Sequence, residues 1–292
     1  MMLICDWLDV TYAPDNCPYP ELNLLLLGAG FSLARTQDAH RSYVPPSGRG
    51  MLKVTHSHRY AKVSMSGGCC ASLRASGLWE EALSILGSSP HRVTRLDAAL
   101  DVPLDAADVL DKLRRKYPAG EVFLSRKAQR VTEFTSVRAD GRRSGTYYVG
   151  HKDKARQSVR VYDKSLQMLE KFGETIPTTT RYEVTARKDY GATLRDAALP
   201  ESIFWHIAAP AILKAPKGVP VWTPNLDQVW AHKASTFTAY EVMRNRVENS
   251  PELDALLDLA DSVGPCGRTM LLSLLAKRAD VPTDASHDQA AG

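Results

Sequence analysis

The sequence predicts an α+β protein with a mixed or largely antiparallel sheet, helices packed on one face of it, and further helices near the C-terminal end. Three observations favour this class. Several short segments alternate polar and apolar residues, which is typical of half-buried strands. Longer segments between them carry apolar residues at helical spacing. Hydrophobic residues make up 44% of the 292 residues, which is enough to build a sizeable core.

The predicted elements follow one another along the chain. Strands are expected at residues 5–12, 53–65 (one strand or a hairpin arm), 92–101, 121–124, 131–137, 145–150, 157–164 and 180–187. Helices are expected at residues 69–87, 105–117, 164–173 and 200–213. Asp105 is a suitable N-cap for the second of these helices, and Pro118 ends it. Residues 13–50 look irregular, apart from the apolar run Leu24–Leu27, which fits a buried strand or a helix.

Composition divides the chain into three predicted parts. Residues 1–215 contain the expected strands and form the main domain. Proline and glycine residues between 215 and 224 indicate a linker, and helices near 225–248, 251–262 and 267–278 would make residues 216–279 a helical C-terminal region. Residues 280–292 are polar, and we expect a disordered tail there.

Residues 159–164 carry the most informative pattern in the chain. Alternation along a strand places Arg160, Tyr162 and Lys164 on one face, with Val159 and Val161 on the other. Two cations beside a tyrosine can lower the pKa of the phenol and hold phosphate oxygens, which prepares the phenol to attack phosphorus. A half-exposed strand with an amphipathic tyrosine is the alternative interpretation.

Two further expected strands carry carboxylates on a charged face. Asp97 and Asp101 share a face with Arg95, and Glu183 shares a face with Arg181. The water-facing side of a soluble sheet would explain each strand by itself. Together, the three charged faces indicate one site that combines a tyrosine, a lysine and carboxylates suited to a hard divalent cation.

Six motifs, in a fixed order, resemble those of a known family. They are Asp6-Trp7-Leu8-Asp9-Val10-Thr11-Tyr12; Ser66-Gly67-Gly68-Cys69 before a helix that includes Trp79; Arg95-Leu96-Asp97-Ala98-Ala99-Leu100-Asp101; Gly145-Thr146-Tyr147-Tyr148-Val149-Gly150; Ser158-Val159-Arg160-Val161-Tyr162-Asp163-Lys164; and Arg181-Tyr182-Glu183. Over residues 6–200 the sequence is similar to the replication initiation factor family of rolling-circle plasmids and filamentous phages, which includes some relaxases of conjugative elements.

The resemblance implies a chemistry. Such initiators nick one DNA strand at a replication origin: a tyrosine attacks the phosphodiester, becomes joined to the 5′-phosphate, and frees a 3′-OH for a polymerase. In this sequence Tyr162 would be the nucleophile, with Lys164 and Arg160 acting at the phosphate. Asp97, Glu183 and Asp101 would be the candidate ligands of a divalent metal, Mg²⁺ or Mn²⁺.

Strand geometry limits the metal assignment. Asp97 and Asp101 are four residues apart, which corresponds to about 13 Å on a regular strand. Both would bind one ion directly only if the strand bulges or ends between them. This favours Asp97, which lies in mid-strand.

The resemblance also implies partners and a location. The partners would be origin DNA, single-stranded or as a cruciform nick site, a host helicase and a host polymerase, with a homodimer as one option and no membrane. Residues 1–215 would be the nicking domain, and residues 216–279 would serve DNA recognition, dimerisation or as a lid. The location would be the cytoplasm of a bacterial host, and the chemistry requires no organic cofactor.

The sequence departs from the family pattern in one place, and a second family trait cannot be assigned. An acidic residue is expected shortly after Tyr162-Asp163-Lys164, but Gln167 stands there and Glu170 follows about one helical turn later. Glu170 either replaces that carboxylate or the role is absent. The second tyrosine that acts in the closing step of relatives has three candidates, which are Tyr147, Tyr148 and Tyr182, and each fits a packing role equally well.

Positive charge concentrates around the candidate nucleophile. Residues 125–189 contain fifteen Lys and Arg against eight Asp and Glu, a local charge of +7, whereas the whole chain carries +4. Five of these cations surround the expected strand at 145–150: Arg142, Arg143, Lys152, Lys154 and Arg156. They form a candidate DNA-binding surface, because phosphate contacts supply most of the affinity of such proteins. A solvated hairpin loop is the alternative.

Cysteine usage and the hydropathy pattern point to a reduced, water-soluble protein. The five cysteines are odd in number and include the adjacent Cys69 and Cys70, so a disulfide framework is not expected, and no CxxC pair suggests structural zinc. Asp6 and Asp9 fall where a secretory signal would be apolar, and Leu24–Leu27 is too short to span a membrane.

Two other function classes remain open from the sequence. One is a non-catalytic origin-binding or regulatory DNA-binding protein that keeps the fold. The other is an RNA-binding α+β domain whose aromatic residues stack on bases. A covalent protein–DNA adduct that needs metal would separate the catalytic class from both.

Overall fold

The structure is a computed structural model that describes residues 3–37, 40–122, 130–137, 143–151, 155–188, 190–209, 212–225 and 262. The chain divides into two compact units, residues 1–232 and 233–292. The expected C-terminal helices and the polar tail lie outside the described residues, apart from Ser262. No helix in the described part is both long and apolar enough to cross a membrane.

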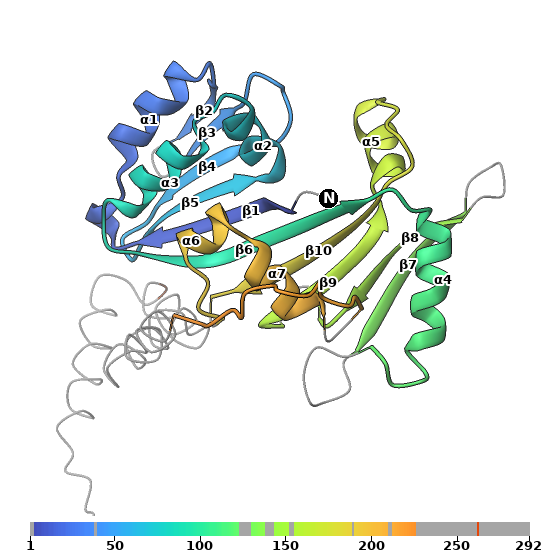
Figure 1. Cartoon of the computed structure of the whole chain (residues 1–292). Coiled ribbons are helices and arrows are strands. Elements are labelled where there is room, and N and C mark those ends of the chain that lie inside the picture. The colour runs from blue at the N-terminus through green and yellow to red at the C-terminus, as the bar shows by residue number, and fades with distance from the viewer. Residues whose placement is uncertain are drawn as a thin grey trace, which may run out of the picture. The chain divides into compact units, whose positions relative to one another are not determined.

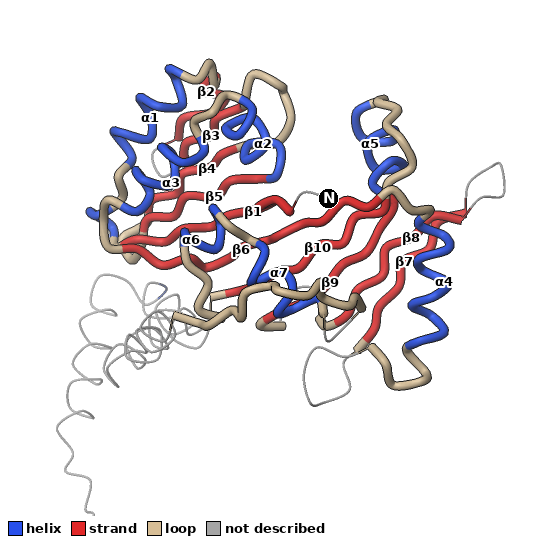
Figure 2. Tube along the Cα trace, viewed as in Figure 1, coloured by secondary structure: helices blue, strands red, loops and turns tan. Residues whose placement is uncertain are grey.

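The first unit is built on one ten-stranded sheet with the strand order β2-β3-β4-β5-β1-β6-β10-β9-β8-β7 (Figures 1 and 2). Its strands are β1 (Leu3–Tyr12), β2 (Ser32–Gln37), β3 (His40–Val44), β4 (Leu52–His56), β5 (Ala61–Ser66), β6 (His91–Val102), β7 (Val131–Val137), β8 (Arg143–Val149), β9 (Gln157–Asp163) and β10 (Thr180–Arg187). Every pair of neighbouring strands is antiparallel. The predicted α+β class with a largely antiparallel sheet is therefore confirmed.

The sheet repeats one topology twice. In the first half, β1 is followed by a helix and then by a four-strand meander whose last strand, β5, returns to pair with β1. In the second half, β6 is followed by a helix and then by the meander from β7 to β10, which returns to pair with β6. The two halves join through the long antiparallel pairing of β1 with β6. This repeat leaves no visible trace in the sequence.

Helices cover the apolar face of the sheet. They are α1 (Tyr19–Gly28), α2 (Gly67–Ala75), α3 (Trp79–Gly87), α4 (Ala106–Lys116), α6 (Leu194–Ala198) and α7 (Glu201–Ala208). Their apolar residues pack with buried strand residues such as Leu8, Leu96 and Val184 in one core. A further helix, α5 (Lys164–Phe172), follows β9 directly and stands at the strand ends (Figure 1).

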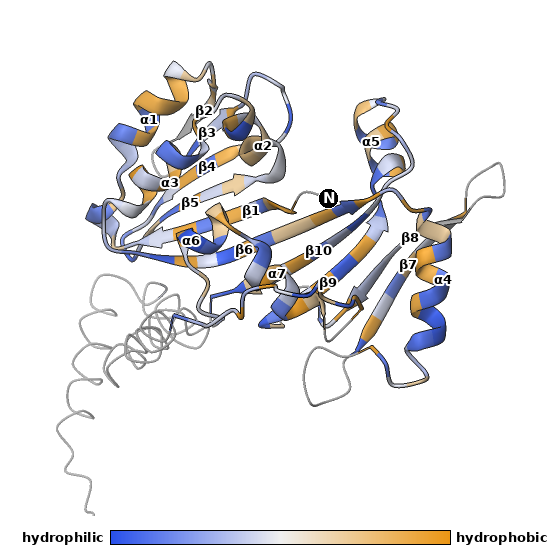
Figure 3. Cartoon of the chain, viewed as in Figure 1, coloured by the Kyte–Doolittle hydropathy of each residue, from blue (hydrophilic) through white to orange (hydrophobic). Residues whose placement is uncertain are grey.

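The register brings the predicted charged faces to the other side of the sheet. Directly opposed residues of neighbouring strands point to the same side. The opposed pairs are Tyr162 with Arg181, Arg181 with Asp101, Arg160 with Glu183, and Asp97 with Trp7. Figure 3 shows the matching alternation of hydrophilic and hydrophobic residues along β9 and β10. The same strands therefore supply one face to the core and the other to a polar surface.

Several expected boundaries differ from the structure for local physical reasons. Residues 13–50 are not irregular: they form α1, β2 and β3, and the run Leu24–Leu27 is helical. The helix expected at 69–87 is two helices, because Gly77 adopts a φ of 75° that a continuing helix cannot accommodate. The expected strand at 121–124 is not a strand at residues 121–122, and the rest of it lies outside the described residues.

The segment expected to be a linker packs against the sheet domain. Trp222 is 7% exposed, stacks on Tyr190 with ring centroids 4.6 Å apart, and donates a hydrogen bond to Asp196 of α6. This contact ties residues 215–225 to the first compact unit. The division predicted after residue 215 stays a prediction for the C-terminal region.

Two partly desolvated histidines should make the stability of this unit sensitive to acid. His206 of α7 packs 5.0 Å from the ring of Trp222, and burial lowers its pKa. An unfolded histidine titrates near pH 6.5, so below about pH 6.5 the unfolded chain binds a proton that the folded chain resists. We therefore expect the free energy of unfolding to fall as the pH drops below that value, measured by denaturant midpoints at about pH 7 and about pH 5.

A matched pair of variants tests the cause of this acid sensitivity. His206→Phe keeps an aromatic ring against Trp222 and should weaken the pH dependence. The residual dependence should come from His56, whose pKa burial also lowers. His58→Phe, in the turn between β4 and β5, should leave the pH dependence as it is. Equal pH dependence in the wild type and His206→Phe would contradict this assignment.

Candidate active site

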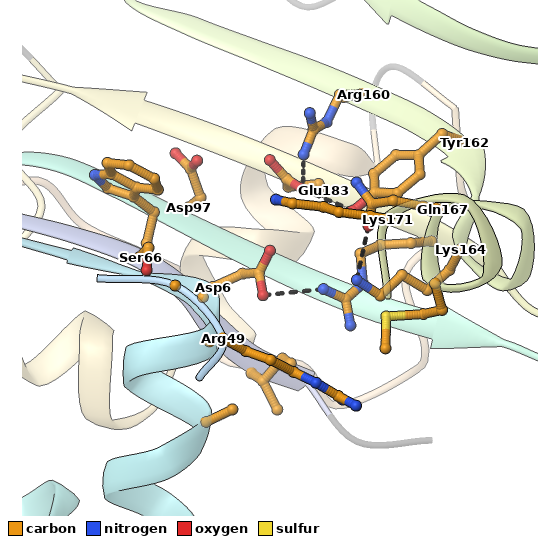
Figure 4. A pocket seen from close by; sticks show the side chains of 18 of the residues that line it. Asp6, Arg49, Ser66, Asp97, Arg160, Tyr162, Lys164, Gln167, Lys171 and Glu183 are labelled. Carbon is orange, nitrogen blue, oxygen red and sulfur yellow. Dashed lines mark hydrogen bonds and ion pairs between the residues drawn. The ribbon is translucent and has the colours of Figure 1, made fainter. Parts of the chain in front are cut away.

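The polar face of the sheet holds a cavity of about 450 Å³ beside the predicted nucleophile (Figure 4). Its floor comes from β1, β6, β10 and β9, and its walls come from the residues before and at the start of α2 and from α5. The charged side chains that line it are Asp6, Arg49, Arg95, Asp97, Arg160, Lys164, Lys171, Arg181 and Glu183. The cavity thus gathers five of the six predicted catalytic and metal-binding residues, and Asp101 is not among those that line it.

A β-bulge in β1 turns Asp6 into this cavity. Cys5 lies opposite Ala98 and Trp7 lies opposite Asp97, so Asp6 is an extra residue in the ladder between β1 and β6. Without the bulge, alternation would place Asp6 on the apolar face. Burial raises the pKa of the Asp6 carboxyl, although Arg181 donates a hydrogen bond to it at 2.9 Å.

Asp97 lies in the middle of β6 and is 2% exposed. Both of its oxygens accept hydrogen bonds from Arg95, which stacks over the ring of Trp7 at 4.6 Å. Burial raises the pKa of the Asp97 carboxyl, and the ion pair with Arg95 opposes that change. The carboxylate is therefore buried and held in place by its ion pair with Arg95.

Tyr162 on β9 is 5% exposed and contacts two charged neighbours. Arg160 lies over its ring at 4.5 Å and forms an ion pair with Glu183. The phenol donates a long hydrogen bond of 3.4 Å to Oε2 of Glu183. Burial, and then the negative charge of Glu183, raise the pKa of Tyr162.

This direction corrects one expectation from the sequence. The flanking cations were expected to lower the pKa of the phenol, and Arg160 does act in that direction. The desolvation of a nearly buried phenol outweighs it, and Lys164 donates a hydrogen bond to Gln167 at 2.8 Å. The free protein therefore holds Tyr162 protonated.

Lys164 is the first residue of α5 rather than the last residue of the strand. Asp163 caps this helix by accepting a hydrogen bond from the backbone N–H of Leu166. Burial lowers the pKa of Lys164, and the positive charge of Arg181 lowers it further. Lys164 therefore gives up its proton more readily than an exposed lysine.

Arg181 of β10 holds two carboxylates at once. Its guanidinium donates to both oxygens of Asp101 at 2.6 Å and to Asp6 at 2.9 Å, and its side chain is 7% exposed. The pairing of β6 with β10 runs without a register shift from Asp97 to Asp101. The structure therefore does not bring Asp101 and Asp97 together, and it places Asp101 in an arginine pair.

The wall opposite Tyr162 depends on two glycines. Gly67 lies so close to Asp6 that a Cβ would stand 2.5 Å from its Oδ1 atom, and a Cβ on Gly68 would overlap the carbonyl oxygen of Arg49. These close approaches let the start of α2 and the Arg49 loop border the cavity. Arg49 there pairs with Glu174, which follows α5.

Three carboxylates of the cavity are candidates for a divalent metal. Asp6, Asp97 and Glu183 offer oxygen ligands of the kind that Mg²⁺ and Mn²⁺ prefer. Each is paired with an arginine, and within the described ranges no three His, Cys, Asp or Glu side chains lie close enough together to hold an ion. The donor set fits a hard cation, provided that the arginines release their carboxylates to it.

The predicted DNA-binding cations are only partly described. Arg142, Lys152 and Lys154 lie outside the described residues, and Arg143 is described only as part of β8. Arg156 stacks over the ring of Tyr190 at 5.5 Å. The phosphate-binding role of all five stays a prediction.

Sequence reasoning missed Asp6, Arg181 and Arg49 as site residues. One feature of the sequence could have identified Asp6. Alternation assigns it to the apolar face together with Leu8 and Val10, and a carboxylate is unexpected there. Arg181 was placed on the charged face but given no role. Arg49 comes from a loop whose path no local pattern predicts.

Replacing Arg181 should strongly destabilise the fold. Arg181→Met leaves Asp6 and Asp101 without their buried partner, and removing one member of a buried pair costs on the order of 3 kcal/mol or more. Arg114→Met is the matched control, because Arg114 also pairs with two carboxylates, Asp111 and Glu133, but is 36% exposed. We expect it to cost less than about 1 kcal/mol in denaturant unfolding. Equal losses would contradict the role given to Arg181.

Comparison with known proteins finds similarity at the level of the fold. No protein-family model matches the sequence, and no curated protein does. Among solved structures, the rolling circle replication initiator protein from Geobacillus stearothermophilus is similar, with a TM-score of 0.52 and 20% sequence identity over 80% of this chain and 95% of that chain. The likeness shows a shared fold and confirms, at that level, the resemblance found in the sequence.

Proposed function

We propose that this chain is a replication initiator that nicks one DNA strand at a replication origin and later rejoins it, starting rolling-circle replication. The observation that carries the proposal is the gathering of Tyr162, Glu183, Arg160 and the acidic side chains in one cavity. That cavity lies on a sheet whose fold matches a rolling-circle initiator. A phenol nucleophile, cations and carboxylates are the groups that phosphodiester transfer by a tyrosine requires.

The proposed reaction exchanges one phosphate ester for another. The phenol oxygen of Tyr162 forms a bond to the phosphorus, and the bond from phosphorus to the 3′ oxygen breaks. The 5′-phosphate stays on the tyrosine, and the 3′ oxygen leaves as a hydroxyl after it takes up a proton. The energy of the broken ester is kept in the new one, so the reverse reaction rejoins the strand without ATP.

Two cations of the cavity have roles in this step. Arg160 would bind a phosphate oxygen, because its guanidinium lines the cavity and its side chain is 31% exposed. Lys164 has a lowered pKa, which allows its neutral amine to accept the phenol proton or its ammonium to stabilise the pentavalent phosphate.

A divalent metal, Mg²⁺ or Mn²⁺, would be held by Asp97, Glu183 and Asp6 once these carboxylates leave their arginine partners and move closer together. It would polarise the scissile phosphate and neutralise developing charge. Glu183 would then no longer raise the pKa of Tyr162 through an uncompensated negative charge. The phenol of the free protein is protonated, so the chemistry is coupled to the arrival of ligands in the cavity.

The proposed partners follow from the reaction. The substrate is origin DNA, single-stranded or extruded as a cruciform, and a host helicase and polymerase would extend the freed 3′ end. Arg142, Arg143, Lys152, Lys154 and Arg156 would bind its phosphates. Residues 216–279 would recognise the origin, dimerise the chain or cover the cavity, and the setting would be the cytoplasm of a bacterium that carries a phage, plasmid or integrated element.

A non-catalytic DNA-binding role on the same fold is the second candidate. One observation favours it: each carboxylate of the cavity is already neutralised by an arginine, and Tyr162 is held protonated. Such a closed network would suit a protein that binds the origin without cutting it. The two candidates differ in whether a covalent adduct ever forms.

One experiment separates the two roles. The purified chain is incubated with supercoiled plasmid that carries its own gene region, with Mn²⁺ or Mg²⁺, and the digest is searched for nucleotide adducts by mass spectrometry. Relaxed plasmid and a nucleotide on Tyr162 are the expected results. Binding without a nick or an adduct under every metal condition would favour the non-catalytic role.

A further inference from the structure

A second cavity of about 390 Å³ adjoins the first on the far side of Tyr162. The two cavities share Tyr162, Gln167 and Lys171 as lining residues. Phe134, Thr146 and Leu166 complete the apolar and neutral part of the second one. The two cavities therefore meet at the side chain of Tyr162.

Phe134 is a large apolar side chain that the sheet leaves open. It is 58% exposed, although it lies on the polar face of β7. Tyr148 meets its ring edge-to-face, with centroids 5.8 Å apart and planes at 88°. This contact fixes the orientation of the Phe134 ring. The exposed part of the ring therefore faces solvent in one defined orientation.

The register sets the distance from this ring to the nucleophile. Phe134 lies opposite Thr146, and Thr146 lies opposite Tyr162, so all three stand in one row across the sheet. Two strand spacings amount to about 10 Å between the backbones of Phe134 and Tyr162. A single nucleotide spans such a distance from its phosphate to its base.

We infer that Phe134 is a stacking platform for a nucleobase of the strand whose scissile phosphate lies at Tyr162. The inference rests on the proposed function and adds a subsite to it. Phosphate contacts by Arg160 and Lys164 hold the backbone, whereas Phe134 receives a neighbouring base on its exposed face. Stacking on an aromatic ring accepts any base, so this subsite favours single-stranded over paired DNA rather than one sequence.

The occupant is a base and not a second copy of the chain, because the ring opens into the cavity that contains Tyr162. An apolar surface of a second chain would have to enter beside Asp163, Glu170 and Lys171. It would remove water from their polar groups, which is unfavourable. A base presents an apolar face to Phe134 and polar edges to those side chains. The chemistry of the cavity therefore matches a nucleotide better than a protein surface.

The test compares two single-stranded probes that differ only in their bases. Binding of the full chain to a labelled oligothymidylate and to an abasic oligonucleotide of equal length is measured by fluorescence anisotropy. Phe134→Ala should weaken binding of the oligothymidylate by roughly 5- to 150-fold, the range expected for one stacked base. The same variant should bind the abasic probe as the wild type does, because the phosphates of that probe still contact the protein.

Three further measurements make the test decisive. Phe134→Trp should restore the preference for the probe with bases, and Val137→Ala, at a 70% exposed position on the same strand, should not alter it. Equal binding of both probes by Phe134→Ala and the wild type would overturn the subsite. A change in oligomeric state in Phe134→Ala without loss of base preference would also overturn it and assign Phe134 to a protein contact.

The experiments distinguish a wrong subsite from a wrong function. If Phe134→Ala nicks DNA normally and keeps the preference for the probe with bases, the subsite is wrong and the initiator role stands. Base preference that depends on Phe134 without any nick or adduct supports the platform on a binding protein. If the wild type binds neither probe, the subsite is wrong, and the nicking experiment with the plasmid still decides the initiator role.

Discussion

Tyr162→Phe is expected to abolish nicking and adduct formation while leaving DNA binding unchanged. Removal of a covalent nucleophile typically lowers the rate by on the order of 10³-fold or more. The fold should tolerate the change, because the phenol makes only a 3.4 Å hydrogen bond to Glu183 and its ring remains stacked under Arg160. Relaxation of supercoiled plasmid and a gel-shift assay measure the two properties side by side.

Tyr147→Phe is the matched control for this experiment. Tyr147 is the neighbouring strand's tyrosine, is 1% exposed, and points to the apolar face of the sheet. Its loss should leave nicking intact. An adduct that persists in Tyr162→Phe and maps to Tyr148 or Tyr182 would keep the initiator role but contradict the assignment of the nucleophile.

Glu183→Gln is expected to lower metal-dependent nicking by on the order of 10²- to 10³-fold. The estimate corresponds to the several kcal/mol that a bound metal contributes at a transferring phosphate. The same change should remove most of the increase in melting temperature that Mn²⁺ gives the wild type. Glu133→Gln is the control, since Glu133 is also a strand glutamate paired with an arginine but lies outside both cavities.

The titration of Tyr162 provides an independent readout in the same variant. The charge of Glu183 raises the pKa of the phenol, so replacing it by an amide should move the phenol titration to lower pH. Ultraviolet difference spectra of the metal-free variant against Tyr162→Phe would report this shift. Lower activity together with a lower phenol pKa would show that Glu183 acts through more than the protonation state of the tyrosine.

Period-two patterns made the central strands predictable from the sequence. The alternation at Arg160, Tyr162 and their neighbours identified both the strand and its polar face, because a one-residue shift would bury the charges. Asp105 and Pro118 set the limits of α4 for equally local reasons. The charged faces of β6, β9 and β10 could therefore be assigned before their pairing was known.

The remaining features depend on contacts between distant segments. The bulge at Asp6 depends on how β1 pairs with β6, and alternation alone gives the wrong face for it. The pKa of Tyr162 depends on burial under α5 and on Glu183, which the spacing of the cations does not reveal. Arg49 reaches the cavity only because Gly67 and Gly68 allow a close approach of backbones.

The pairing of β1 with β6 has a consequence for the assembly of the protein. Asp6, Trp7 and Arg49 come from the first half of the sheet, whereas Asp97 and Tyr162 come from the second. The cavity thus exists only after segments far apart in the sequence have docked, and such non-local pairing is a slow event in folding. Cross-strand ion pairs such as Arg160 with Glu183 form only in the native register, so a misaligned sheet would lack the candidate site. The candidate site is therefore complete only when both halves of the sheet have paired in the native register.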